Sequence, residues 1–237
     1  MAKPPPPLSS GVYLVATPIG NLEDITARAL RVLRECDLIA CEDTRHTGRL
    51  LSRLGIKKPL VSYHEHNEAR RAGELAGRAL SGERVAVVSD AGTPGVSDPA
   101  YRVVRAAIEA GVAVVPVPGA SSVLAALTAS GLPTDSFVFE GFLPSKGRKR
   151  LQKIEALLDE ERTVVVFESP HRTPRLASEI AAIAPARPLA LAREITKLHE
   201  EILRETAQGL AEILKDRKIK GECVLLIGPK RMERTDD

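Results

Sequence analysis

Short apolar runs alternate with amphipathic stretches along the first half of the chain. Uninterrupted runs of four or five apolar residues are typical of buried strands in a parallel sheet. Apolar residues spaced three and four apart predict helices. The expected strands are 12–16, 38–41, 60–63, 85–89 and 112–115, and the expected helices are 23–35, 45–54, 68–80 and 99–110. The alternation predicts a parallel sheet with helices on both faces and right-handed crossovers.

The pattern changes in the second half, where some of the apolar runs lie closer together. The expected strands are 137–142, 163–168, 189–193, 201–205 and 223–227, and the expected helices are one through 127 and then 151–158, 174–182 and 207–214. The short polar link between 189–193 and 201–205 favours antiparallel pairing, because parallel strands need a long crossover. We therefore expect the second half of the chain to form a mixed sheet.

These patterns predict an α/β chain of two domains. The first, residues 11–119, has a parallel-rich sheet, and the second, residues 120–237, has a mixed α+β sheet. Residues 1–10 hold four consecutive prolines and lack the apolar core of a signal peptide, so they are expected to form a disordered tail.

Three of the predicted strands in the first domain end in turns rich in glycine, proline and small polar residues. The turns are 17–22, 89–99 and 116–122. Glycine allows a ligand to approach the backbone, and the carboxyl ends of parallel strands share one edge of the sheet. We therefore expect the turns to converge on a ligand, with Asp90 facing it; a tight turn in which Asp90 only caps a helix is the alternative. Ser97 or Asp98 is expected to cap the next helix, with Pro99 at its first position.

Composition narrows the function classes. The 237 residues carry 34 basic and 31 acidic side chains, a net charge of +3 that does not by itself indicate a nucleic-acid-binding protein. Aromatic residues make up 3%, so base stacking is not the expected mode of recognition. The three cysteines lack metal-ligand spacing and suit a reducing cytoplasm. No run approaches about 18 apolar residues, so no membrane span is expected.

One basic cluster stands out from the weak net charge. Lys146, Arg148, Lys149 and Arg150 form the densest group of cations in the chain and lie where no apolar periodicity requires packing. Such a loop before a helix can hold phosphates, so we predict that these four side chains contact RNA. A solvated helix face is the alternative.

Four segments in order along the chain carry a resemblance to a known family. They are TPIGNLEDIT (17–26), CEDTR (41–45), SDAGTPGVSDP (89–99) and VPGAS (117–121). Together they resemble the tetrapyrrole methylase superfamily and, within it, the group that methylates small-subunit ribosomal RNA. Turn 17–20 lacks the glycine-rich form of corrin-making relatives, which favours the RNA group; Ala100 replaces a glycine that many members carry.

The resemblance implies a methyltransferase of two α/β domains that uses S-adenosylmethionine, held in the cleft between the domains. It implies 2′-O-methylation of a cytidine ribose in the decoding region of small-subunit rRNA by a homodimer. Separately, the weak net charge predicts loose binding to naked RNA and so favours the assembled subunit as the substrate. No metal is implied. The implied cofactor-binding residues are Asp90, Thr93, Pro94, Gly95, Ser121 and Ser122, with Pro18 and Gly20 allowing close backbone approach.

A ribose hydroxyl must lose its proton as the new bond forms, so a carboxylate at the same sheet edge is expected. Glu42 and Asp43 directly follow the buried strand 38–41. Asp43 is the first candidate for the base or for a group that orients the hydroxyl, with Glu42 beside it. The N-cap of helix 45–54 is an equally good interpretation of Asp43.

Two other functions compete with this one. A methylase acting on a tetrapyrrole or a protein side chain predicts a large apolar substrate cleft and no role for the basic loop. A non-enzymatic RNA- or nucleotide-binding module predicts that Asp90→Ala affects stability alone. The dense polar turn around Asp90 argues against a mere scaffold.

Overall fold

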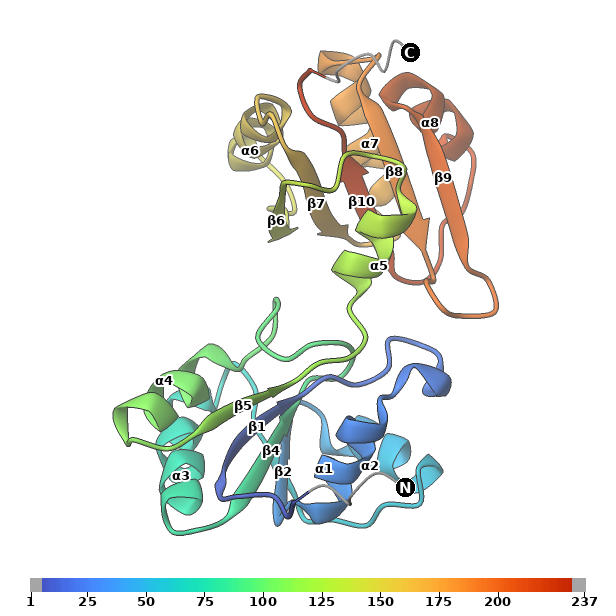
Figure 1. The fold of residues 1–237 in the computed structure, drawn as a ribbon. Helices are drawn as coiled ribbons and strands as arrows, with labels where there is room; N and C mark the ends of the chain where they lie inside the picture. Colours follow the sequence, from blue (N-terminus) through green and yellow to red (C-terminus); the bar gives the residue numbers. More distant parts are fainter. Residues whose placement is uncertain (1–5, 232–237) are drawn as a thin grey trace. The chain divides into compact units, whose positions relative to one another are not determined.

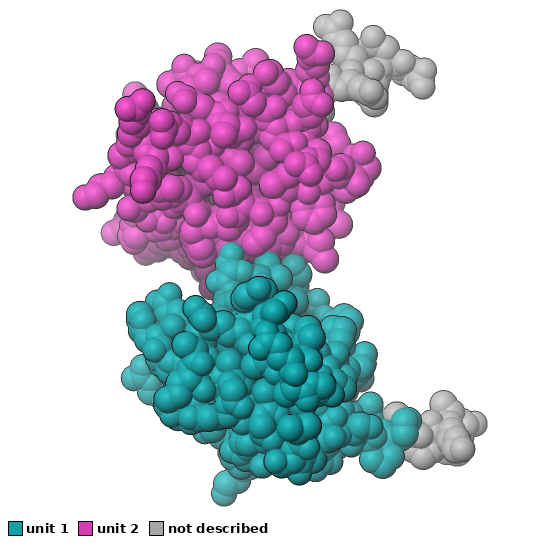
Figure 2. Space-filling model, turned by 90° about the vertical axis from the view of Figure 1, so that its left-hand side faces the viewer, with its two compact units in different colours: residues 1–121 teal, residues 122–237 magenta. Residues whose placement is uncertain are grey.

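The computed structural model describes residues 6–231 and divides the chain into two compact units, Met1–Ser121 and Ser122–Asp237 (Figures 1 and 2). Residues 1–5 of the predicted tail lie outside the described part. Residues 6–10 contact the first unit, because the Tyr13 hydroxyl donates to the Ser9 carbonyl at 2.6 Å and Arg31 Nη1 donates to the Pro6 carbonyl at 2.9 Å. Leu8 also packs against the apolar cluster beneath it.

The first unit is built on a five-stranded sheet in which every pairing is parallel, as predicted (Figure 1). In spatial order the strands are β3 (Leu60–Ser62), β2 (Leu38–Cys41), β4 (Arg84–Val88), β1 (Gly11–Val15) and β5 (Val114–Val117). Helices α3 (Glu68–Leu80) and α4 (Tyr101–Glu109) pack on one face, and α1 (Ala27–Glu35) and α2 (Thr44–Arg53) pack on the other.

Two elements of this unit differ from the prediction. The expected helix 23–35 is divided into a 3-10 turn, Leu22–Asp24, and α1, because Ile25 and Thr26 are extended and the Thr26 hydroxyl accepts from the Ala29 amide as the cap of α1. Strand β5 runs to Val117, two residues beyond the predicted end. Pro116 is tolerated there because β5 is an edge strand, where an amide donor is dispensable.

The second unit has a mixed five-stranded sheet, which confirms the predicted fold class (Figure 1). In spatial order the strands are β6 (Phe137–Phe142), β7 (Thr163–Glu168), β10 (Cys223–Ile227), β8 (Pro188–Arg193) and β9 (Glu201–Thr206). Only the pairing of β6 with β7 is parallel. Helices α6 (Arg148–Leu158), α7 (Thr173–Ile183) and α8 (Ala207–Leu214) cover one face, and α5 (Ser122–Ala129) packs on the other.

The three cysteines lie in the cores of the units and form no disulfide. Cys36 and Cys41 are buried in the first unit and Cys223 is buried in the second. Burial raises the pKa of all three thiols, that of Cys36 to about 11. They act as small apolar side chains rather than as reactive groups.

Candidate functional site

The turns that follow β1 and β4 are joined by their backbones. The Thr17 amide donates to the Gly92 carbonyl at 2.9 Å, and the Gly92 amide donates back to the Thr17 carbonyl at 3.1 Å. Gly92 has a φ of +81°, a conformation that glycine adopts without strain. The first two glycine turns therefore meet at the carboxyl edge of the sheet.

The turn that follows β5 reaches the same place. The Thr93 hydroxyl donates to the Ala120 carbonyl at 3.1 Å. A Cβ atom on Gly119 would lie 2.9 Å from the Cβ of Ala16, closer than two such atoms can pack. Glycine at this position is what lets the third turn lie against the first. The three turns converge as the pattern predicted.

Asp43 is the N-cap of α2. Its Oδ1 accepts from the Arg45 amide at 2.7 Å and from the His46 amide at 3.3 Å, and its Oδ2 lies 3.2 Å from Arg45 Nη2. The side-chain and backbone hydrogen bonds from Arg45 lower the pKa of Asp43 to about 2. A carboxylate this acidic is a poor proton acceptor near neutral pH. The structure therefore supports the capping interpretation of Asp43 over that of a general base.

The backbone of Asp43 connects the capping site to Asp90. The Asp43 amide donates to Asp90 Oδ1 at 3.2 Å, which holds the half-buried Asp90 side chain at the edge of the sheet. The turn after β2 and the turn after β4 are thus held together through one carboxylate.

Glu42 has a different environment from its neighbour. It lines an open pocket of about 610 Å³ in the first unit, together with Glu65, Glu68, Ser97, Asp98, Pro99, Tyr101 and Arg102. Burial, and then the nearby charges of Asp90 and Glu65, raise the pKa of Glu42. A carboxyl group with a raised pKa exchanges protons closer to neutral pH than an ordinary one does.

Asp98 does not have the capping role that the sequence predicted for Ser97 or Asp98. Helix α4 begins at Tyr101, and its N-cap, Ala100, offers no side-chain hydrogen bond, so neither Ser97 nor Asp98 caps it and Pro99 precedes it. Asp98 lines the pocket instead, where burial and the charge of Glu42 raise its pKa to about 6. The feature of the sequence that could have indicated this position is that Asp98 is an acidic residue in the turn that follows the predicted strand 85–89.

The missing cap of α4 is supplied from another strand. The Val103 amide donates to the hydroxyl of Tyr63, at 3.1 Å, and Tyr63 directly follows β3. Burial raises the pKa of Tyr63 to about 12, so the hydroxyl stays neutral. Nothing in the spacing of the sequence indicates this contact, which joins residues 40 positions apart.

The remaining predicted cofactor residues lie on the same turns. Pro94 is buried, Pro18 is half-buried, and Gly20 and Gly95 are exposed, Gly95 with a φ of +88°. Ser121 is the last residue of the first unit, and Ser122 is the first residue of α5.

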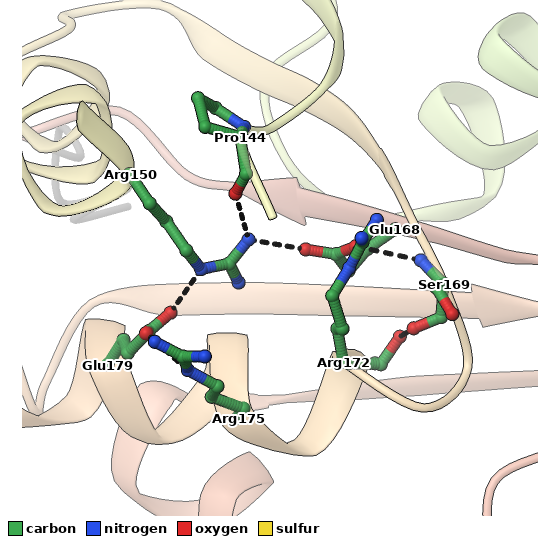
Figure 3. A network of polar contacts seen from close by, with 8 residues as sticks. Pro144, Arg150, Glu168, Ser169, Arg172, Arg175 and Glu179 are labelled. Atoms are coloured by element: carbon green, nitrogen blue, oxygen red, sulfur yellow. Dashed lines mark hydrogen bonds and ion pairs between the residues drawn. The ribbon is translucent and has the colours of Figure 1, made fainter. Parts of the chain in front are cut away.

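The basic cluster is divided by the structure. Lys146, Arg148 and Lys149 are exposed, whereas Arg150 is fully buried. Arg150 Nη1 lies 2.8 Å from Glu168 Oε2, and its Nε lies 2.8 Å from Glu179 Oε2 (Figure 3). The prediction that Arg150 contacts RNA is therefore wrong, because two carboxylates already hold its charge inside the unit. For the other three side chains, which are exposed, contact with RNA stays a prediction.

In residues 6–231 no group of three or more His, Cys, Asp and Glu side chains is arranged to hold a metal ion. Within the same residues, no helix has the length and apolar character needed to cross a membrane.

Comparison with known proteins gives one consistent family. Residues 11–211 match the family model described as Tetrapyrrole (Corrin/Porphyrin) Methylases. The chain is 49% identical over 228 residues to the ribosomal RNA small subunit methyltransferase I of Mesorhizobium japonicum, covering 95% of this chain and 78% of that one. It is 47% identical over 225 residues to the protein of the same name from Synechocystis, covering 94% and 81%.

Solved structures show the same fold. The uroporphyrin-III-C-methyltransferase of Thermus thermophilus matches with a TM-score of 0.66 at 26% identity, covering 92% of this chain and 94% of that one. A structure of uroporphyrin-III C-methyltransferase from Thermus thermophilus with S-adenosylhomocysteine bound matches with a TM-score of 0.63 at 22% identity, covering 92% and 97%.

Proposed function

The chain belongs to the tetrapyrrole methylase family, and from this premise we propose that it transfers a methyl group from S-adenosylmethionine to the 2′-hydroxyl of a cytidine ribose in the decoding region of small-subunit rRNA. The observation that carries the proposal is its identity of 47–49% with proteins named ribosomal RNA small subunit methyltransferase I, over nearly its whole length. The tetrapyrrole-methylating neighbour is only 26% identical. The alternative substrates, a tetrapyrrole or a protein side chain, are correspondingly less well supported.

The three converging turns fit a cofactor that has both polar and extended parts. Gly92 and Gly119 keep side chains out of the space where the turns meet, and Asp90 presents a carboxylate oxygen at the sheet edge. We assign cofactor binding to Asp90, Thr93, Pro94, Gly95, Ser121 and Ser122, with Pro18 and Gly20 allowing close approach. When bound, the cofactor supplies an already activated methyl group, so the protein mainly binds, orients and handles the proton.

We assign removal of the proton from the ribose hydroxyl to Glu42 rather than to Asp43. The raised pKa of Glu42 and its place on the pocket suit a general base, whereas the carboxylate of Asp43 is occupied by the start of α2. Asp43 keeps a positioning role, because its amide holds Asp90.

The exposed cations Lys146, Arg148 and Lys149 are assigned to RNA phosphates. A net charge of only +3 gives weak binding to naked RNA, so the assembled small subunit, with its defined shape, is the proposed substrate. The reaction is proposed to take place in the cytoplasm and to involve a homodimer.

The proposal is tested by transfer of a labelled methyl group from S-adenosylmethionine to small ribosomal subunits that lack the modification, with naked rRNA alongside. A ribose 2′-O-methyl group blocks alkaline cleavage at its own linkage. The expected result is label in one alkali-resistant dinucleotide, from the subunit more than from naked rRNA. Label absent from RNA, although calorimetry shows that the protein binds the cofactor, would refute the rRNA substrate.

The two carboxylates are separated by matched variants. Glu42→Gln is expected to lower kcat by about 10²-fold, the usual contribution of a general base, with little change in cofactor affinity. Asp43→Asn keeps a capping oxygen and is expected to retain most activity. The reverse order of the two effects would return the base to Asp43.

A further inference from the structure

The four phenylalanines of the chain gather on two neighbouring strands. Phe137, Phe139 and Phe142 lie on β6, and Phe167 lies on β7. The ring centroid of Phe167 is 4.9 Å from that of Phe139 and 5.4 Å from that of Phe142. Phe139 and Phe167 pack against the apolar cluster under α5, whereas Phe142 is 61% exposed. The row of rings therefore ends in an aromatic surface open to solvent.

A β-bulge turns Phe142 onto that face. Phe139 is in register with Val165 and Gly141 with Val166, so Glu140 is an extra residue in β6. Residues three apart on a regular strand point to opposite faces, but one extra residue restores Phe142 to the face of Phe139. Gly141 adopts a φ of +74° at this point, which a larger residue would adopt only with strain.

Helix α6 fixes both the bulge and the loop that follows it. Lys153 Nζ lies 2.7 Å from Oε1 of Glu140, the extra residue. Arg150 Nη1 donates to the Pro144 carbonyl at 3.0 Å while it is held by Glu168 (Figure 3). Side chains of α6 thus hold the segment between Phe142 and that helix in place.

The anchored loop and the first turn of α6 carry exposed charge with no protein partner. Lys146, Arg148 and Lys149 make no salt bridge with any residue from 6 to 231, although nearby Lys153, Arg172 and Arg175 all do. Three unneutralised cations that follow the exposed ring within seven residues of the chain match the chemistry of single-stranded RNA, which offers phosphates and the flat faces of bases.

We infer that Phe142 is a stacking platform for one unpaired base of the RNA, with Lys146, Arg148 and Lys149 holding the phosphates beside it. The inference rests on the proposed function and adds a contact to it. The low aromatic content argued against base stacking, but content counts rings without locating them. One ring is enough when a bulge exposes it and the segment that follows it carries free cations.

The test measures the affinity of unmodified small subunits for variants at fixed salt, by filter binding. Phe142→Ala and Phe142→Leu are expected to weaken binding roughly tenfold to hundredfold, the effect of losing one stacked base, and Phe142→Trp to preserve it. Phe137→Ala is the matched control on the same strand and is expected to bind normally. Calorimetric affinity for S-adenosylmethionine and the thermal unfolding midpoint are expected to stay unchanged in all four variants.

The charges are tested separately from the ring. Replacing Lys146, Arg148 and Lys149 by Gln is expected to reduce the dependence of binding on salt concentration, because fewer counterions are released. Phe142→Ala is expected to leave that dependence unchanged.

Three results would overturn the inference. Normal binding by Phe142→Leu would show that an apolar surface suffices without a ring. Loss of cofactor affinity in Phe142→Ala would assign the ring to the cofactor, and a changed sedimentation coefficient would assign it to contact between two copies of the chain. Wild-type protein that methylates no RNA would instead refute the proposed function itself.

Discussion

The two units hold their polar surface segments in different ways. In the first unit the turns are locked by main-chain hydrogen bonds and by glycine contacts, as between Thr17 and Gly92 and between Gly119 and Ala16. In the second unit the basic loop is locked by buried side chains, above all by Arg150 between Glu168 and Glu179.

The difference affects what each segment can present. In the first unit, the carboxylates of Glu42 and Asp98 form no ion pair with any residue from 6 to 231, and burial raises the pKa of both. A loop held by one buried arginine leaves its other cations free for solvent and ligands. The first arrangement suits proton handling and close approach of a ligand, and the second suits contact with a polyanion.

Removing the buried arginine breaks the second arrangement and has the largest expected effect. Arg150→Ala removes the buried partner of Glu168, which keeps only its pair with the partly exposed Arg172, and we expect the free energy of unfolding to fall by about 3 kcal/mol. Denaturant titration measures it. The control is Arg175→Ala, whose half-exposed pair with Glu179 is expected to contribute less than about 1 kcal/mol. Equal small losses would show that the loop does not depend on the buried pair.

Filling the contact between turns breaks the first arrangement. Gly119→Ala places a Cβ atom against Ala16, and we expect a loss of about 2 kcal/mol of stability with weaker cofactor binding. Gly73→Ala, in open space on α3, is the matched control and is expected to stabilise by about 0.5–1 kcal/mol. Unchanged stability and cofactor affinity in Gly119→Ala would mean that the turns can separate freely.

The pH dependence of stability sharpens the contrast in carboxylates. Folded Asp98 keeps its proton up to about pH 6, whereas the unfolded chain releases it near pH 3.8. The folded state therefore binds more protons between these values, and stability falls as pH rises through that window. Asp98→Asn removes this loss and is expected to be more stable than wild type by about 1–2 kcal/mol above pH 6, after discounting for partial exposure. Parallel stability curves from pH 4 to 7 would contradict it.

Tyr63→Phe tests a place where a helix of the first unit depends on a distant side chain. The Val103 amide loses its acceptor, and we expect a loss of about 1 kcal/mol. The measurement is denaturant titration together with hydrogen exchange of the Val103 amide, which should become faster. Unchanged exchange would show that the hydroxyl does not hold the start of α4.

Sequence patterns predicted most of the fold, because strand periodicity and glycine turns are local signals. The turns of the candidate site were found for the same reason. The errors share a cause: Arg150 was read as exposed, and Asp98 as a cap, although tertiary packing decides both. One residue of helical rotation separates the solvent-facing Lys149 from the buried Arg150, and a run of like charges hides that rotation.

Because the three thiols are buried, their reactivity reports how often each unit opens to solvent. Reagents that modify thiolates reach Cys36 and Cys41 only when the first unit opens, and Cys223 only when the second does. The rates of alkylation at the two sets of cysteines, resolved by peptide mass analysis, would therefore time the excursions of the two units separately in unmodified protein. Adding the cofactor and then ribosomal subunits would show in which unit each ligand slows alkylation, and so which unit it stabilises against opening.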